Sequence, residues 1–246
     1  RDEFTNRPTA PMAYWSDYPT VLAGRDLQSN GSWMGVTAEG RVAMLTNIRN
    51  SALNKGEAAP SRGQLVNNYL IHGNLPNREQ TAQYSGFNLI VGDLTRLDFH
   101  ECSNHHLLNP SNSPPDDAVM KAIQPGIFTL SNDKSESVWP KTKKLGASLK
   151  QLLQQETLPE DPSDLSLQLF PLLQDRQQAP DEQLPNTGIP LEWERMLSAI
   201  QIVSPGYGTR SSTVMVLDKN KRLHIQEISY HPDGSPMLNQ TYKLFL

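Results

Sequence analysis

Short apolar runs separated by turn residues fill much of the first half of the chain and predict strands. Residues 32–47 contain two such runs on either side of a turn at residues 38–40, which ends in glycine. Residues 86–93 and 96–103 repeat this arrangement, and a buried strand is predicted over residues 126–132. The first two regions are therefore expected to form antiparallel hairpins.

A helical period first occurs after residue 60. Leu65, Tyr69 and Leu70 fall at helical spacing, so the segment 61–73 is predicted to be a helix. Ser61 is expected to cap its start and Gly73 to end it. Residues 77–84 are predicted to add another helical turn.

The period becomes helical again from residue 141 to residue 174. Two amphipathic helices are predicted there, the second beginning at Asp161 and Pro162, since proline suits the first helical position. We expect both to pack on the outer face of a sheet through their leucines, which include Leu145, Leu149, Leu152, Leu165, Leu169 and Leu172. Residues 191–200 form a further short helix in this prediction.

The end of the chain is predicted to consist of strands. Runs at 211–218, 222–230 and 240–246 are separated by turns at 219–220 and 231–236. Strand pairs, then helices, then strand pairs indicate an α+β architecture with antiparallel sheets and outer helices. We expect a single domain over residues 1–246, with surface loops at 109–117 and 176–190.

Composition and charge exclude several classes of protein. Apolar residues make up 37% of the 246 residues, enough for a folded core. The 22 Lys and Arg against 26 Asp and Glu give a net charge of −4, which provides no basic surface for nucleic acid or an anionic membrane. No apolar run approaches the ~20 residues of a membrane-spanning helix. No export signal is present, and a cytoplasmic protein is expected.

Cys102 is the single cysteine and cannot form an internal disulfide. It lies near three histidines, His100, His105 and His106, but their spacing fits no standard zinc pattern. A solvated loop with a buried thiol is favoured over a metal site, so no metal and no cofactor are predicted. Signatures such as GxSxG, GxxxxGK[ST] and HExxH are also absent.

Polar residues at the ends of the predicted strands are the candidate functional residues. Asn47 and Asn132 each close an apolar run, Arg210 opens one, and Arg1 and Asp2 begin the chain. Asn amides can stabilise an oxyanion, and an Arg guanidinium can orient a carboxylate or a nucleophile. Taken singly, each residue is better explained without a function, because Asn commonly ends a strand by starting a turn and Arg commonly lies at the rim of a sheet.

Several segments together resemble a known family. They are RDEFTNRPTAPMAYW, LAGRDLQSNGSWMGVTAEGRVAMLTNIRN, SRGQLV, GFNLIVGD, LSND, VWPK and YGTRSST, and they run in order through nearly the whole chain. The chain is thereby identified as a member of the NRDE family, also called the transport and Golgi organisation 2 family. The full motif of that family is Asn-Arg-Asp-Glu, and this chain opens at its second residue.

The resemblance implies an N-terminal-nucleophile (Ntn) hydrolase-like fold, an αββα sandwich of two antiparallel sheets with outer helices. It also implies a remote similarity to cholylglycine hydrolases and penicillin V acylases, which cleave amides with an N-terminal cysteine. By motif order, Arg1 and Asp2 resemble their early Arg and Asp. Asn47 and Asn132 resemble their two Asn residues, and Arg210 resembles their late Arg.

The nucleophile itself is not among these residues. Members of the family usually carry a Cys near the initiator Met, and Cys102 cannot replace it because this chemistry uses a free α-amino group as the base. Since the chain opens at Arg1 without Met, we expect further residues upstream. The resemblance thus implies a cysteine-dependent amide or thioester hydrolase. The alternative is a non-catalytic binding or trafficking protein for haem or acyl-type ligands.

Overall fold

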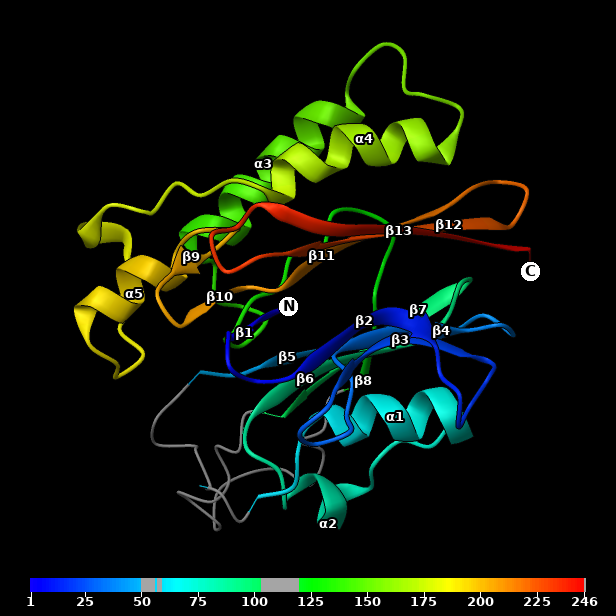
Figure 1. The fold of residues 1–246 in the computed structure, drawn as a ribbon, viewed down its shortest axis with the longest axis horizontal. Helices are drawn as coiled ribbons and strands as arrows, with labels where there is room; N and C mark the ends of the chain where they lie inside the picture. The colour runs from blue at the N-terminus through cyan, green and yellow to red at the C-terminus, as the bar shows by residue number, and fades with distance from the viewer. Residues whose placement is uncertain (50–55, 57–58, 103–119, 246) are drawn as a thin grey trace. The chain divides into compact units, whose positions relative to one another are not determined.

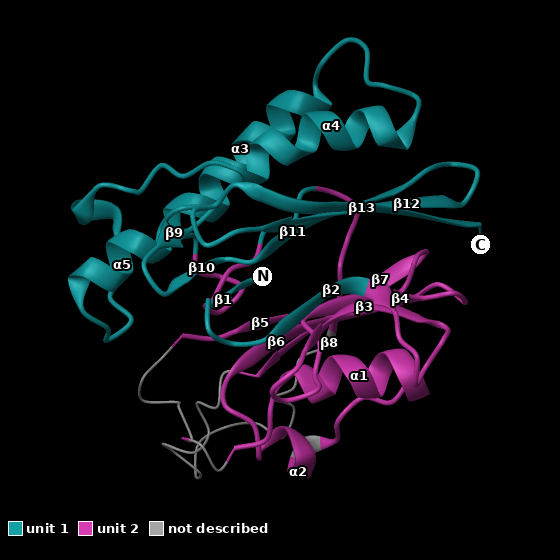
Figure 2. Cartoon of the chain, viewed as in Figure 1, with its two compact units in different colours: residues 1–12, 127–129, 138–246 teal, residues 13–126, 130–137 magenta. Residues whose placement is uncertain are grey.

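The computed structural model describes residues 1–245 apart from 50–55, 57–58 and 103–119. The chain divides into two compact units, one of residues 1–12, 127–129 and 138–246, and the other of residues 13–126 and 130–137 (Figure 2). Antiparallel sheets and helices occur in both, which confirms the predicted α+β class.

The second unit is built on an antiparallel sheet in the strand order β2-β3-β4-β5-β6-β7-β8, in which neighbours along the chain pair with each other (Figure 1). The strands of this sheet are β2 (Thr9–Tyr14), β3 (Val21–Asp26), β4 (Met34–Thr37), β5 (Arg41–Asn47), β6 (Phe87–Asp93), β7 (Arg96–Cys102) and β8 (Met120–Ala122). Most of β2, up to Met12, belongs to the first unit. Both predicted hairpins are confirmed as β4–β5 and β6–β7. Gly40 turns the first with a φ of 88°, a backbone conformation that glycine adopts without strain.

Helix α1 (Gly63–His72) packs on this sheet, and α2 (Arg78–Thr81) follows it. Leu65, Val66 and Leu70 are buried together with Phe87 and Leu89 of β6, which forms the core of the unit. Gly73 ends α1 in the left-handed conformation, as predicted.

The predicted cap by Ser61 is wrong. Arg62 occupies the N-cap position, and no side chain caps the helix. The Ser61 main-chain carbonyl accepts a hydrogen bond from the Gln64 amide instead, so a tight turn takes the place of a hydroxyl cap.

The first unit contains two small sheets, ordered β1-β10-β9 and β11-β12-β13. Their strands are β1 (Asp2–Phe4), β9 (Val203–Ser204), β10 (Tyr207–Thr209), β11 (Ser211–Leu217), β12 (Arg222–Tyr230) and β13 (Pro236–Phe245). β13 starts four residues before the predicted strand at 240, because it pairs along nearly all of β12, with a register shift near Ser229 and Tyr230.

Helices α3 (Pro140–Leu153) and α4 (Pro162–Leu173) confirm the two predicted amphipathic helices. Helix α4 packs against β11 and β12, and α3 packs along α4. The Asp161 carboxylate accepts a hydrogen bond of 2.8 Å from the Ser163 amide, which caps α4 as its sequence predicts. A short 3-10 helix, η3 (Asp181–Gln183), and α5 (Leu191–Leu197) complete the unit.

The strand predicted over residues 126–132 does not form. Ile127 and Phe128 are exposed, and the carbonyls of residues 131–133 accept hydrogen bonds from other partners than a neighbouring strand. Those partners are the Thr46 hydroxyl, the Arg49 amide and the Asn88 side-chain amide. This segment is therefore a loop, whose carbonyls are bound by donors from β5, from the residues that follow β5, and from β6.

Candidate functional site

Three of the candidate residues meet in the first unit, at the pairing of β1 with β10. Asp2 lies opposite Thr209 in this antiparallel pair, and the Thr209 hydroxyl donates a hydrogen bond of 2.7 Å to the Asp2 carboxylate. The Arg210 amide donates a hydrogen bond of 2.6 Å to the Arg1 carbonyl. The main-chain nitrogen of Arg1 donates one of 2.8 Å to the Ser211 carbonyl. The pairing of β1 with β10 thus brings Arg1, Asp2 and Arg210 together.

The Arg210 side chain holds the loop that follows β1. Its Nη1 atom donates to the carbonyls of Phe4, Thr5 and Arg7 at 3.1, 3.2 and 3.3 Å. One guanidinium nitrogen therefore organises the turn between β1 and β2, while the Arg210 main chain pairs with Arg1. Arg1 itself forms an ion pair of 2.8 Å with Glu3.

The remaining two candidates, Asn47 and Asn132, meet in the second unit. The Asn132 Nδ2 atom donates a hydrogen bond of 3.1 Å to the Asn47 carbonyl, and the Arg49 amide donates to the Asn132 carbonyl at 2.7 Å. An Asn side-chain nitrogen carries two hydrogens, and among the described residues only the Asn47 carbonyl accepts from Asn132 Nδ2, which leaves one N–H for another acceptor. This is the chemistry that an oxyanion requires.

Asn88, which the sequence analysis missed, fixes the segment that carries Asn132. It is fully buried, and its Nδ2 atom donates to the Asp133 carbonyl at 2.7 Å and to the Thr46 hydroxyl at 3.1 Å. The Thr46 hydroxyl in turn donates to the Ser131 carbonyl at 2.8 Å. Asn88 interrupts the apolar run at the start of the strand FNLIVGD, and this position is the signal that would have identified it.

Glu227 is a second residue that the sequence analysis missed. It is only 1% exposed, and its carboxylate accepts hydrogen bonds from the Met12 amide at 2.6 Å and from the Thr213 hydroxyl at 3.0 Å. The Tyr242 hydroxyl donates to the Met12 carbonyl at 2.7 Å, so both polar groups of the Met12 backbone are bound by side chains of the β11–β13 sheet.

Register defines a polar patch around Glu227 on one face of the β11–β13 sheet. Residues directly opposite one another in antiparallel strands point to the same face. Glu227 lies opposite Thr213 and Gln240, and the next row along this face pairs Ser211 with Ser229. The Ser211 hydroxyl is buried without a hydrogen-bond partner in the described part of the chain. Ser211 also connects to Arg1, whose main-chain nitrogen donates to the Ser211 carbonyl.

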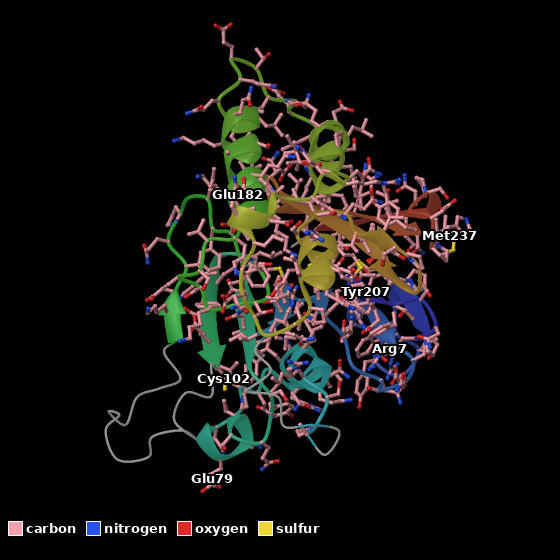
Figure 3. All side chains as sticks on the ribbon, turned by 90° about the vertical axis from the view of Figure 1, so that its left-hand side faces the viewer. Arg7, Glu79, Cys102, Glu182, Tyr207 and Met237 are labelled. Carbon is pink, nitrogen blue, oxygen red and sulfur yellow. The ribbon has the colours of Figure 1, made fainter. Side chains whose placement is uncertain are left out.

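Cys102 ends β7 and is 9% exposed, in contact with the apolar core that contains Tyr84 and Phe87 (Figure 3). The prediction of a buried thiol is confirmed. Burial lowers the pKa of His100 on the same strand. His105 and His106 lie outside the described residues, and within the described ones no group of His, Cys, Asp and Glu is arranged to hold a metal ion.

An aromatic cluster covers the outer end of the β1–β10 pair. Phe4, Trp193 and Tyr207 lie with ring centroids 5.1 to 6.2 Å apart and with tilted or edge-to-face orientations. Tyr207 is labelled in Figure 3. The cluster joins β1 to α5 and β10 within the first unit.

These features define an α+β protein whose polar strand ends form two organised groups, one in each unit. The chain belongs to the Transport and Golgi organisation 2 family, whose model matches residues 1–232. This confirms the family indicated by the sequence motifs.

Curated relatives agree with this membership. The human Transport and Golgi organization protein 2 homolog is 30% identical over 262 residues, covering 100% of this chain and 90% of the relative. The bovine homolog is 31% identical over 93% of this chain and 84% of the relative. The Drosophila melanogaster protein is 26% identical over 92% of this chain and 83% of the relative.

No described helix combines the length and the apolar character that crossing a membrane would require.

Proposed function

We propose that residues 1–246 form one domain with an Ntn-hydrolase-like fold, an αββα sandwich of two antiparallel sheets with outer helices. Each unit supports this proposal by itself. In one, α1 packs on the sheet that contains β3 to β6, and in the other, α4 packs on β11 and β12. Two layers of sheet and helix are the components that such a sandwich requires.

The proposed catalytic residues are the five that the family resemblance names. Asn47 and Asn132 would stabilise an oxyanion, and Asp2 and Arg210 would orient the α-amine of a nucleophilic cysteine on a strand that precedes Arg1. Arg1 would stand beside that amine. The observation that carries the proposal is the hydrogen bond between Asp2 and Thr209, 207 residues apart, which joins the early and late motifs as the family resemblance requires.

The reaction is cysteine-dependent hydrolysis of an amide or thioester. The α-amine takes the thiol proton, and the thiolate attacks the acyl carbon to form a tetrahedral oxyanion. The leaving amine or thiolate takes that proton as its bond to the acyl carbon breaks. Water, deprotonated by the same amine, then hydrolyses the acyl-enzyme and restores the thiol. The protein would act in the cytoplasm, without a metal or an organic cofactor.

The test uses the full-length protein, with any residues that precede Arg1. Incubation with decanoyl-CoA and N-decanoylglycine should release decanoic acid and leave a decanoyl mass on an N-terminal cysteine. Asn132→Ala should lower turnover by about 10²–10³-fold, as loss of one oxyanion donor does in other acyl-transfer enzymes. Asn74→Ala, an exposed change outside the site, is the matched control. Absence of turnover and of the acyl adduct would refute the hydrolase.

The second candidate is a non-catalytic binding or trafficking protein for haem or acyl-type ligands. The names of the relatives, which refer to transport and Golgi organisation, favour it. Binding of decanoyl-CoA or haem without turnover, by a protein that lacks an N-terminal cysteine, would establish this alternative.

A further inference from the structure

Arg62, at the N-cap of α1, has no acidic side chain paired with it in the described part of the chain. Arg25, Arg195 and Arg222 each contact an aspartate at 2.7 Å or less. Arg62 has a single hydrogen bond, from Nη1 to the Gly86 carbonyl at 2.9 Å. The first turn of α1 contains no acidic residue that would neutralise it.

The surroundings of this guanidinium are unfavourable for an isolated charge. Arg62 is partly buried, and this burial lowers the pKa of its guanidinium below the usual range. Arginine nevertheless remains protonated in proteins, so the charge is desolvated without a described counter-charge. The one hydrogen bond of the side chain to a described group is made by Nη1, and Arg62 is neither buried nor fully exposed.

Arg62 is also linked to the Asn47–Asn132 pair through one short stretch of backbone. The Gly86 carbonyl that accepts from Arg62 also accepts from the Ile48 amide at 2.9 Å. Ile48 lies between Asn47, whose carbonyl binds the Asn132 side chain, and Arg49, whose amide binds the Asn132 carbonyl. Arg62 and Asn132 therefore approach the same end of β5.

We propose that Arg62 binds a carboxylate or phosphate group of the ligand whose acyl carbonyl is bound at Asn132. This inference rests on the proposed function, since it takes the Asn47–Asn132 end of β5 as part of the acyl site. A guanidinium has five N–H donors in a planar fork that matches the oxygens of these anions, and a described group accepts from only one nitrogen of Arg62. The ligand class is thus an acyl compound with an anionic group, such as an N-acyl amino acid or an acyl-CoA.

The test compares two pairs of probes that differ in charge. N-Decanoylglycine is paired with neutral N-decanoylglycinamide, and decanoyl-CoA with neutral S-decanoyl-N-acetylcysteamine. Binding is measured by calorimetry on the full-length protein, on Arg62→Gln and Arg62→Lys, and on Arg41→Gln. Arg41 begins β5, so its substitution removes the same charge at the other end of the same strand.

We expect the wild type to prefer the anionic member of at least one pair by about tenfold or more, the effect of a hydrogen-bonded charge. Arg62→Gln should lose this preference and Arg41→Gln should keep it. Arg62→Lys should retain part of it, because an ammonium cannot form the bidentate contact. A preference within the glycine pair identifies a carboxylate ligand, and one within the thioester pair identifies a phosphate ligand.

Three results would overturn the proposal: no binding of either anionic probe, no preference in the wild type, or an undiminished preference in Arg62→Gln. If Arg62→Gln does not fold, Arg62→Lys decides, and an unchanged preference in it overturns the bidentate contact. Turnover is recorded separately. A charge preference without release of decanoic acid would refute the hydrolase and leave the anion site in place.

Discussion

Replacing the buried Glu227 tests how the Met12 segment is held within the first unit. Glu227→Ala removes the acceptor of the Met12 amide at 2.6 Å and of the Thr213 hydroxyl at 3.0 Å, and it leaves a cavity at a residue that is 1% exposed. Hydrogen bonds to a charged group contribute about 1.5–3 kcal/mol each. Removing a buried charge offsets part of this loss. We therefore expect a net destabilisation of about 2–4 kcal/mol.

Glu227→Gln separates the hydrogen bonds from the charge. Its carbonyl oxygen can still accept from the Met12 amide, and its NH₂ can donate to the Thr213 hydroxyl oxygen, so a loss of no more than about 1 kcal/mol is expected. Urea unfolding followed by tryptophan fluorescence measures both variants, with the exposed Glu182→Ala as control. Equal losses in the Ala and Gln variants would show that the charge, and not the hydrogen-bond geometry, stabilises this position.

Three further outcomes are expected. Leu152→Ala should cost about 2–5 kcal/mol in thermal or urea unfolding, because Leu152 is buried on α3; an unchanged midpoint would show that this helix is peripheral. Burial lowers the pKa of His224 in the folded state, so the unfolded state binds more protons as the pH falls through 6.5. Stability should therefore decrease from pH 7 to 5, and less so in His224→Gln; identical pH profiles would exclude His224 as the cause. Arg210→Ala should accelerate amide hydrogen exchange at Thr5 and Arg7, whose carbonyls it binds, whereas the exposed Arg222→Ala should not. Equal exchange rates in the two variants would contradict this role.

Elements with strong local signals were predictable from the sequence. The turn at Gly40 lies between two apolar runs, and Asp161 followed by Pro162 starts a run of regularly spaced leucines. Each of these signals depends on neighbours within a few residues, so the chain determines the local conformation without distant partners. The corresponding hairpin and helix are both present.

Elements that depend on distant partners were not predictable in the same way. Strand β1 has three residues, and it forms because Asp2 and Phe4 pair with a strand more than 200 residues away. The sequence pattern predicts the end of a strand just before residue 133, but the carbonyls of residues 131–133 accept hydrogen bonds from Thr46, Arg49 and Asn88. Neither the pairing nor the donors are visible within a local window of sequence.

The family resemblance identified the candidate residues from the order of the motifs along the chain. Which groups these residues contact could be learned only from the structure. The resemblance placed Asn132 in the site but gave no reason to examine Asn88, the buried amide that anchors its loop. Glu227 did leave a signal, because it falls in the same phase of β12 as the buried Leu223 and Ile225. A carboxylate on the buried face of a strand is unusual enough to identify a structural or functional role.

The aromatic cluster at the β1–β10 pair contains a tryptophan whose fluorescence depends on this pairing. Trp193 is 37% exposed, whereas Trp15 and Trp139 are buried, so a quencher such as iodide should reach Trp193 more readily than those two. Its ring lies 6.2 Å from Phe4 of β1 and 5.7 Å from Tyr207 of β10. If β1 separates from β10, the environment of this indole changes before the core unfolds. The emission of Trp193 therefore provides a label-free signal for the state of the strand that carries Asp2.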